Sequence, residues 1–150
     1  MLLDSNLIYR KARLQDVPQI YLFETAYIDE IEPENSERWA HTKDKTVAQL
    51  EANVEKMFVA EVDGKLAGHI YWNIHADKPH IFSIYVLKAF RRVGVARKLM
   101  LLAERDIQEN GFQQCLLSTR THNPAKNLFD EIGYQLIEQD NGWFHLEKNL

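Results

Sequence analysis

The chain has 150 residues, enough for one compact domain with a buried core, and its 45% hydrophobic and 27% charged residues are typical of a folded globular protein. Its formal net charge of -4 argues against a nucleic-acid partner, because phosphate binding needs a clustered basic surface. No apolar run could span a membrane, no signal peptide is evident, and the one cysteine, Cys115, excludes an internal disulfide. We therefore expect a single cytoplasmic domain over residues 1–150, a monomer or homodimer that binds no nucleic acid, membrane or metal.

The first part of the chain predicts a strand followed by two helices. Residues 7–10 are short and apolar, as a strand would be. Asp16 is expected to cap a helix that tolerates Pro18 in its first turn, where a missing N–H costs nothing. The buried stripe of that helix should comprise Val17, Ile20, Phe23 and Tyr27. The acidic stretch 29–45 should be irregular or hold a short helical turn, and a second helix should occupy residues 44–56.

Three strands are expected next. Residues 57–62 and 66–74 are rich in β-prone side chains, and Asp63-Gly64 between them is a strong signal for a two-residue hairpin turn. Residues 81–86 form a third apolar run of the same kind. This part of the chain predicts an antiparallel meander.

Helices and strands alternate in the remainder. Helical spacing returns at Gly94 and stops at Asn110-Gly111, where the glycine suits the left-handed position past a helix end. The elements expected after it are a strand over 114–119, a helix over 124–132, and a hairpin of 134–138 with 143–147 around Asn141-Gly142. The order of elements predicts a mixed α/β domain.

The segment 86–96 joins a predicted strand to a predicted helix. A helix N-terminus offers unpaired N–H groups and the positive end of the helix dipole, so it attracts phosphate oxygens. Small side chains at Gly94 and Ala96 would let a ligand approach the backbone closely. Positive charge around this point comes from Arg91, Arg92 and Arg97. We interpret the segment as an anion or pyrophosphate cradle, with a plain basic helix start as the alternative.

The sequence Arg91-Arg92-Val93-Gly94-Val95-Ala96 resembles the Arg/Gln-x-x-Gly-x-Gly/Ala motif of the Gcn5-related N-acetyltransferases, the GNAT family. Residues 123–134 resemble the second signature of that family, and the order of elements is similar over essentially the whole chain. The resemblance implies an α/β (α+β) fold with a mostly antiparallel sheet of about six to seven strands, about four helices and a splayed central strand pair.

The resemblance also implies acetyl-coenzyme A as co-substrate, with no metal. Backbone N–H groups of residues 92–97 would hold the pyrophosphate. Backbone groups at Ile84 and Val86 would pair with the pantetheine arm as if it were another strand. The residues implied on the other side of the cofactor are Asn123 (or His122, by an alternative spacing) and Phe129 of the following helix.

Phe129 departs from the family pattern, which usually has a tyrosine here to protonate the departing thiolate. Phenylalanine has no proton to give, so the candidate acids are Tyr134, Tyr85 or water. A general base is needed because an alkylamine is mostly protonated at neutral pH. We favour His80 as this base, because imidazole titrates near neutrality, although it could also be an exposed turn histidine. Alternative bases are Glu24, His75 and Asp77.

The acidic stretch between the first two helices is expected to face the acceptor, because in this family the region shapes the acceptor site. Its carboxylates would attract a cationic amine, although a solvated loop is the alternative. The expected substrate contacts are Glu24, Tyr27 and Glu30. Two functions are compatible with these features. One is an N-acetyltransferase in which the amine attacks the thioester directly, and the other is a coenzyme A-binding sensor that has lost catalysis.

Overall fold

The computed structural model describes residues 6–150, which fold around one seven-stranded sheet. Its strands are β1 (Leu7–Lys11), β2 (Met57–Val62), β3 (Lys65–His75), β4 (Lys78–Val86), β5 (Gln114–Arg120), β6 (Gln135–Asp140) and β7 (Trp143–Asn149). Their spatial order is β1-β2-β3-β4-β5-β7-β6, and every neighbouring pair is antiparallel except β4 and β5, which run parallel. The mixed, mostly antiparallel sheet predicted from the sequence is confirmed.

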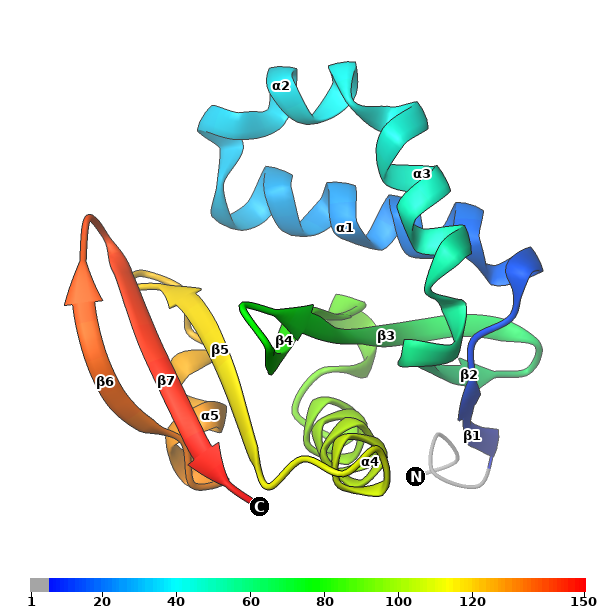
Figure 1. Cartoon of the computed structure of the whole chain (residues 1–150). Coiled ribbons are helices and arrows are strands. Elements are labelled where there is room, and N and C mark those ends of the chain that lie inside the picture. Colours follow the sequence, from blue (N-terminus) through cyan, green and yellow to red (C-terminus); the bar gives the residue numbers. More distant parts are fainter. Residues whose placement is uncertain (1–5) are drawn as a thin grey trace.

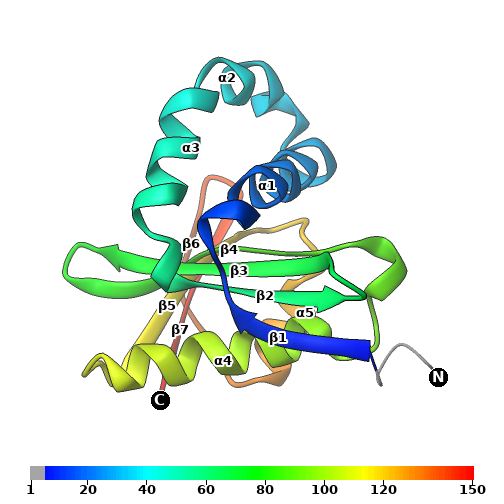
Figure 2. The same ribbon diagram turned by 90° about the vertical axis from the view of Figure 1, so that its right-hand side faces the viewer.

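Helices cover both faces of the sheet (Figure 1). The helices on one face are α1 (Val17–Ile31), α2 (Ser36–His41) and α3 (Lys43–Ala52), and those on the other are α4 (Val95–Glu109) and α5 (Lys126–Glu131). Short 3-10 turns precede or follow them at Leu14–Asp16, Pro33–Asn35, Val54–Lys56 and Lys88–Phe90. Figure 2 shows α1 above the strands and α4 below them. The described residues therefore hold five α-helices where about four were predicted.

The central strands are buried because both of their faces are covered. Six consecutive residues of β3 are buried, so the strand shows no alternation of polar and apolar side chains. The core on the α4 side includes Ile70, Trp72, Leu99, Met100 and Leu146. The core under α1 and α3 includes Val17, Ile20, Leu50, Met57 and Tyr71. The meander thus separates two apolar layers.

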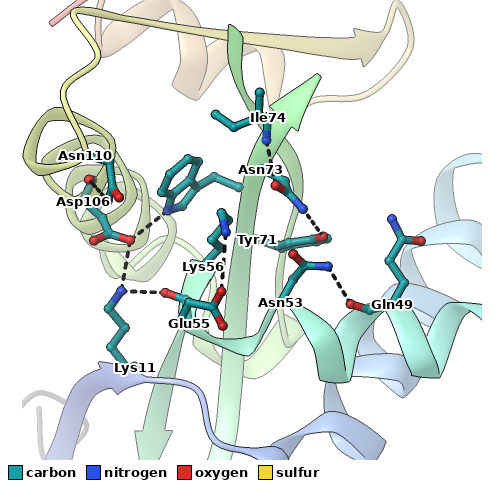
Figure 3. A network of polar contacts seen from close by, with 11 residues as sticks. Lys11, Gln49, Asn53, Glu55, Lys56, Tyr71, Asn73, Ile74, Asp106 and Asn110 are labelled. Carbon is teal, nitrogen blue, oxygen red and sulfur yellow. Dashed lines mark hydrogen bonds and ion pairs between the residues drawn. The ribbon is translucent and has the colours of Figure 1, made fainter. Parts of the chain in front are cut away.

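A buried carboxylate fastens α4 to two strands on the α4 side (Figure 3). Asp106 Oδ2 accepts the indole N–H of Trp72 at 2.9 Å and the ammonium of Lys11 at 3.0 Å. The same ammonium donates to the carbonyl of Glu55 at 2.6 Å. The buried carboxylate is thus both ion-paired and hydrogen-bonded, which offsets the cost of burying it.

The two central strands separate soon after they meet. β4 and β5 pair at His80–Leu116 and Ile81–Leu117, and each strand then continues without pairing to the other. In Figure 1 the three strands β5, β6 and β7 diverge from the β3–β4 meander. This opening is the predicted splayed pair.

Two local expectations are wrong. Asp16 precedes α1 but does not cap it, because its carboxylate accepts the Arg13 N–H at 2.8 Å and both terminal guanidinium nitrogens of Arg10 at 2.8 and 3.0 Å. The stretch 29–45 is largely helical rather than irregular. In this stretch the indole N–H of Trp39 donates to Thr25 of α1 at 2.8 Å, and the Trp39 ring stacks on Tyr21 of the same helix. These contacts with α1 stabilise a short helix whose own sequence has no apolar stripe.

Candidate functional site

The first turn of α4 presents an uncapped helix N-terminus. Gly94 precedes it with φ +90°, a conformation that favours glycine, and nothing lies within 4 Å of where a Cβ would project. Within residues 6–150 no side chain caps this end, and the first intrahelical hydrogen bond runs from Lys98 N–H to Gly94 O. The N–H groups of residues 95–97 therefore remain available, and an anion can approach them without steric obstruction.

The three arginines near this turn have different partners. Arg91 donates from Nε to the Val86 carbonyl at 2.7 Å and pairs with Glu30 of α1 at 3.2 Å. Arg97 pairs with Glu131 of α5 at 2.6 Å. For Arg92, which is exposed, no ion pair is found within the described part of the chain. Arg92 is therefore the guanidinium free to meet a phosphate, whereas Arg91 joins the loop to α1.

β4 forms one wall of the opening. On its β3 side Ile84 pairs with Ile70 and Val86 with Gly68. Its other edge has no strand partner after Ile81 in the described chain, so backbone groups there can pair with an extended ligand. Gly68 allows the close approach of the two strands, since a Cβ on it would lie 2.7 Å from the Tyr85 carbonyl oxygen.

The segment that resembles the second family signature, residues 123–134, follows β5. The side-chain oxygen of Asn123 accepts the N–H of Ala125 at 2.9 Å and so shapes the entry to α5. His122 points elsewhere, because its Nε2 donates to the Ile31 carbonyl at the end of α1, at 2.7 Å. Phe129 is buried on α5 with its ring edge-to-face against Tyr134.

Both tyrosines considered as proton donors are committed to carboxylates. The Tyr134 hydroxyl donates to Glu104 Oε2 at 2.8 Å in the core, and burial, above all, raises its pKa well beyond the ordinary value. The Tyr85 hydroxyl donates to Glu30 Oε1 at 2.6 Å, and burial with this contact raises its pKa to about 12. Neither tyrosine lines the pocket described next.

A pocket of about 440 Å³ is lined by residues of α1, α2 and α3 and of strands β3, β4, β5 and β7, beside the point where β4 and β5 part. Its walls combine aromatic rings with polar side chains, among them one carboxylate. The side chains that line it include Glu24, Trp39, Tyr71, His75, His80, Phe82, Ser83, Ser118 and Trp143.

Of the three predicted substrate contacts, Glu24 alone lines this pocket. The Tyr27 hydroxyl donates to Glu32 at 2.7 Å, and burial raises the pKa of Tyr27. Glu30 contacts Arg91 and the Tyr85 hydroxyl, away from the pocket. The predicted acidic surface is therefore divided between two locations, and one carboxylate reaches the pocket.

Glu24 belongs to a cluster that sequence reasoning missed. Its Oε2 accepts the Ser83 hydroxyl and lies 3.0 Å from Nε2 of His69, which is fully buried on β3. Nδ1 of His69 has no partner in the described chain. If the neutral ring carries its proton on Nε2, that proton is donated to Glu24, and the unpaired Nδ1 is only an acceptor. The contacts therefore favour the tautomer in which His69 donates to Glu24. The residues are 45 and 59 positions apart, and no local pattern connects them.

His80 also lines the pocket. Its Nδ1 lies 2.9 Å from the Lys78 carbonyl, which can only accept, so Nδ1 carries a proton and the lone pair of the neutral ring is on Nε2. The ring packs edge-to-face on His75, also at the pocket, whereas the predicted alternative Asp77 does not line it. This tautomer is the one that a base acting through Nε2 requires.

A sequence model of the Acetyltransferase (GNAT) family matches residues 20–134. The chain belongs to this family. It is an acyltransferase, as predicted from the two motifs. This GNAT enzyme is 29% identical over 143 residues to an N-alpha-acetyltransferase of Sulfurisphaera tokodaii, covering 86% of this chain and 80% of the relative. It is 23% identical over 116 residues to a spermidine N(1)-acetyltransferase of Thermoplasma acidophilum, covering 74% of this chain and 72% of that one.

Solved structures show the same fold. The PaiA N-acetyltransferase of Thermoplasma acidophilum, in complex with coenzyme A, superposes with a TM-score of 0.82 at 19% identity, covering 96% of the GNAT chain described here and 99% of its own. YncA of Salmonella typhimurium, with acetyl-CoA, gives a TM-score of 0.80 at 18% identity over 97% of this chain and 94% of its own. In the described residues no helix is long and apolar enough to cross a membrane.

Proposed function

We propose that this GNAT enzyme transfers the acetyl group of acetyl-coenzyme A to a primary amine by direct attack of the amine on the thioester. The observation that carries the proposal is the opening between β4 and β5, which has an uncapped helix N-terminus at one side and a pocket containing a carboxylate at the other. Two substrates could thus meet from opposite sides. The names of the relatives, an N-alpha-acetyltransferase and a spermidine acetyltransferase, support an amine acceptor.

The residues present fit coenzyme A. Backbone N–H groups of residues 92–97 and the Arg92 guanidinium would hold its pyrophosphate, and the free edge of β4 at Ile84 and Val86 would pair with its pantetheine arm. Asn123 and Phe129 would line the far side. When bound, acetyl-coenzyme A supplies an activated acyl group with a thiolate leaving group.

The pocket would bind the acceptor. Glu24 attracts a cation, and the aromatic rings of Trp39 and Trp143 can face an alkylammonium. His80 would remove the proton from the attacking nitrogen through Nε2. A covalent cysteine intermediate is disfavoured, because Cys115 is buried and its pKa is raised to about 12, chiefly by that burial.

The proposal is tested by measuring coenzyme A binding calorimetrically and thiol release from acetyl-coenzyme A with polyamines, aminosugars, amino acids and peptides. Release with at least one amine class is expected. Gly94→Glu should abolish binding, because its carboxylate would face the phosphates. Gly111→Glu places the same charge at a positive-φ glycine past the opposite end of α4 and should bind normally. Binding without release from any amine would instead favour a coenzyme A-binding regulatory module.

A further inference from the structure

Three polar side chains from three strands form a hydrogen-bonded line at the strand opening. Ser118 of β5 lies directly opposite His145 of β7, and its Oγ is 2.7 Å from Nδ1 of that ring. Nε2 of His145 lies 3.1 Å from Oδ1 of Asp140, at the end of β6. The order serine, histidine, aspartate is the one in which a carboxylate orients an imidazole toward a hydroxyl.

The line connects solvent to the pocket. Ser118 lines the pocket and follows Leu117, the last β5 residue that pairs with β4, so its hydroxyl lies where the two strands part. The side chains of His145 and Asp140 are 33% and 46% exposed. A proton can therefore enter at the exposed ring and reach the opening through a single hydroxyl.

Thioester aminolysis needs a proton at this place. As the carbon–sulfur bond breaks, its electron pair stays on sulfur, and a proton donor within reach stabilises the departing thiolate. Phe129 carries no proton, and the hydroxyls of Tyr134 and Tyr85 donate to Glu104 and Glu30. Ser83 and Ser118 both line the pocket beside the opening, but the Ser83 hydroxyl donates to Glu24. Ser118 is therefore the one of the two serines whose hydroxyl lies beside a partly exposed histidine.

We propose that Ser118 donates its proton to the leaving thiolate and is recharged by His145. The His145 imidazolium passes its Nδ1 proton to Ser118 Oγ as the serine proton moves to sulfur, so that the serine ends unchanged and the imidazole ends neutral. Asp140 stabilises the imidazolium, and after the transfer the neutral imidazole takes up a proton from solvent at its exposed edge, which restores the imidazolium. The acceptor's proton leaves separately through the base. Ser118 is the catalytic residue here and His145 and Asp140 are positioning and relay residues, an assignment that rests on the proposed function.

Other charged groups lie near His145 on the strands β5–β7. Glu138 is the β6 residue paired with His145, and Arg120 lies over the Trp143 ring and pairs with Glu34. Glu147 is two residues along β7 from His145. A pH profile must therefore be compared between variants rather than assigned to one group.

The test uses Ser118→Ala and His145→Gln, with Ser36→Ala as a matched control, because that serine also hydrogen-bonds a polar side chain but lies outside the pocket. Turnover in both relay variants should fall by roughly 10²- to 10³-fold with the KM for acetyl-coenzyme A unchanged, while the control is unaffected. The second measurement needs no turnover. The ultraviolet absorbance of the thiolate gives the pKa of enzyme-bound coenzyme A, which should rise by roughly one unit in both relay variants.

The two measurements separate this inference from the proposed function. If the unmodified enzyme acetylates no amine, the proposed function fails, but the titration of bound coenzyme A still tests the relay. The inference is overturned if the thiol of coenzyme A bound to Ser118→Ala has the same pKa as in the unmodified enzyme. It is also overturned if that variant turns over at the unmodified rate. A loss in Ser118→Ala that His145→Gln does not share also contradicts it, because the serine would then act without recharging.

Discussion

Gly68→Ala tests the close approach of β3 and β4. An added Cβ would lie 2.7 Å from the Tyr85 carbonyl oxygen and 3.2 Å from Val86 Cα, whereas ordinary contact begins at 3.4 Å. Both atoms belong to the β4 backbone, so relief requires the strand to move by about 0.7 Å at the oxygen, which is 3.4 minus 2.7. Overpacking of this kind costs about 1–3 kcal/mol. For a chain of this size the Tm should fall by roughly 2–12 °C.

The displacement also reaches the proposed cofactor wall, because Val86 pairs with Gly68 and its carbonyl accepts Arg91. Losing the equivalent of one hydrogen bond weakens coenzyme A binding by roughly tenfold. The assays are thermal denaturation and calorimetric titration with coenzyme A. Gly142→Ala is the control: its φ of +84° makes alanine strained by about 1–2 kcal/mol, but the space around it is open and it lies in the β6–β7 turn.

Both variants should lose stability, and Gly68→Ala alone should lose affinity. A Gly68→Ala protein with wild-type Tm and affinity would refute the steric argument. Equal loss of affinity in the two variants would show that stability, rather than the position of β4, governs binding.

Three further outcomes are expected. Glu24→Gln should raise the KM for a cationic amine by roughly 10- to 100-fold, as expected for a charged hydrogen bond, and leave that for acetyl-coenzyme A unchanged in steady-state kinetics. Cys115, whose pKa rises from 9.0 to about 12, should resist alkylation at pH 8 by mass spectrometry until denaturant is added. The free energy of unfolding should decline above pH 9. The unfolded chain releases the Cys115 proton near pH 9 and the Tyr85 proton near pH 10, whereas the folded state holds both up to about pH 12, so rising pH favours the unfolded chain. Urea midpoints at two pH values check this, and an unchanged midpoint contradicts it.

Local signals determined much of the fold. Asp63-Gly64 and Asn141-Gly142 adopt positive φ in the two predicted hairpin turns, and Gly94 takes the left-handed conformation before α4. The helix start at Gly94 was predictable because all of its parts lie within one short segment. The family motifs supplied the identity of the ligand expected there.

Long-range chemistry was not predictable in the same way. Glu24, His69 and Ser83 meet because α1 crosses the meander, a packing that no spacing in the sequence encodes. Arg91 was predicted for the cofactor, but its guanidinium contacts Glu30 across 61 positions. The Asp16 carboxylate binds Arg10 and the Arg13 N–H instead of the first turn of α1, and a rule for helix caps does not consider such competing partners. Side-chain competition therefore limits such predictions more than backbone propensity does.

In the described part of the chain only two residue pairs join β4 to β5, so the middle of the sheet is a weakly paired junction, called the seam below. On one side of the seam, β1 to β4 are paired along their lengths, and on the other side β5, β7 and β6 are paired in the same way. Helix α4 packs against strands of both halves. Amide hydrogen exchange should therefore report two separately protected blocks, with the least protected strand amides beside the seam. An anion bound at the first turn of α4 would stabilise the helix that contacts both blocks. Anion binding should therefore slow amide exchange in both halves of the sheet together.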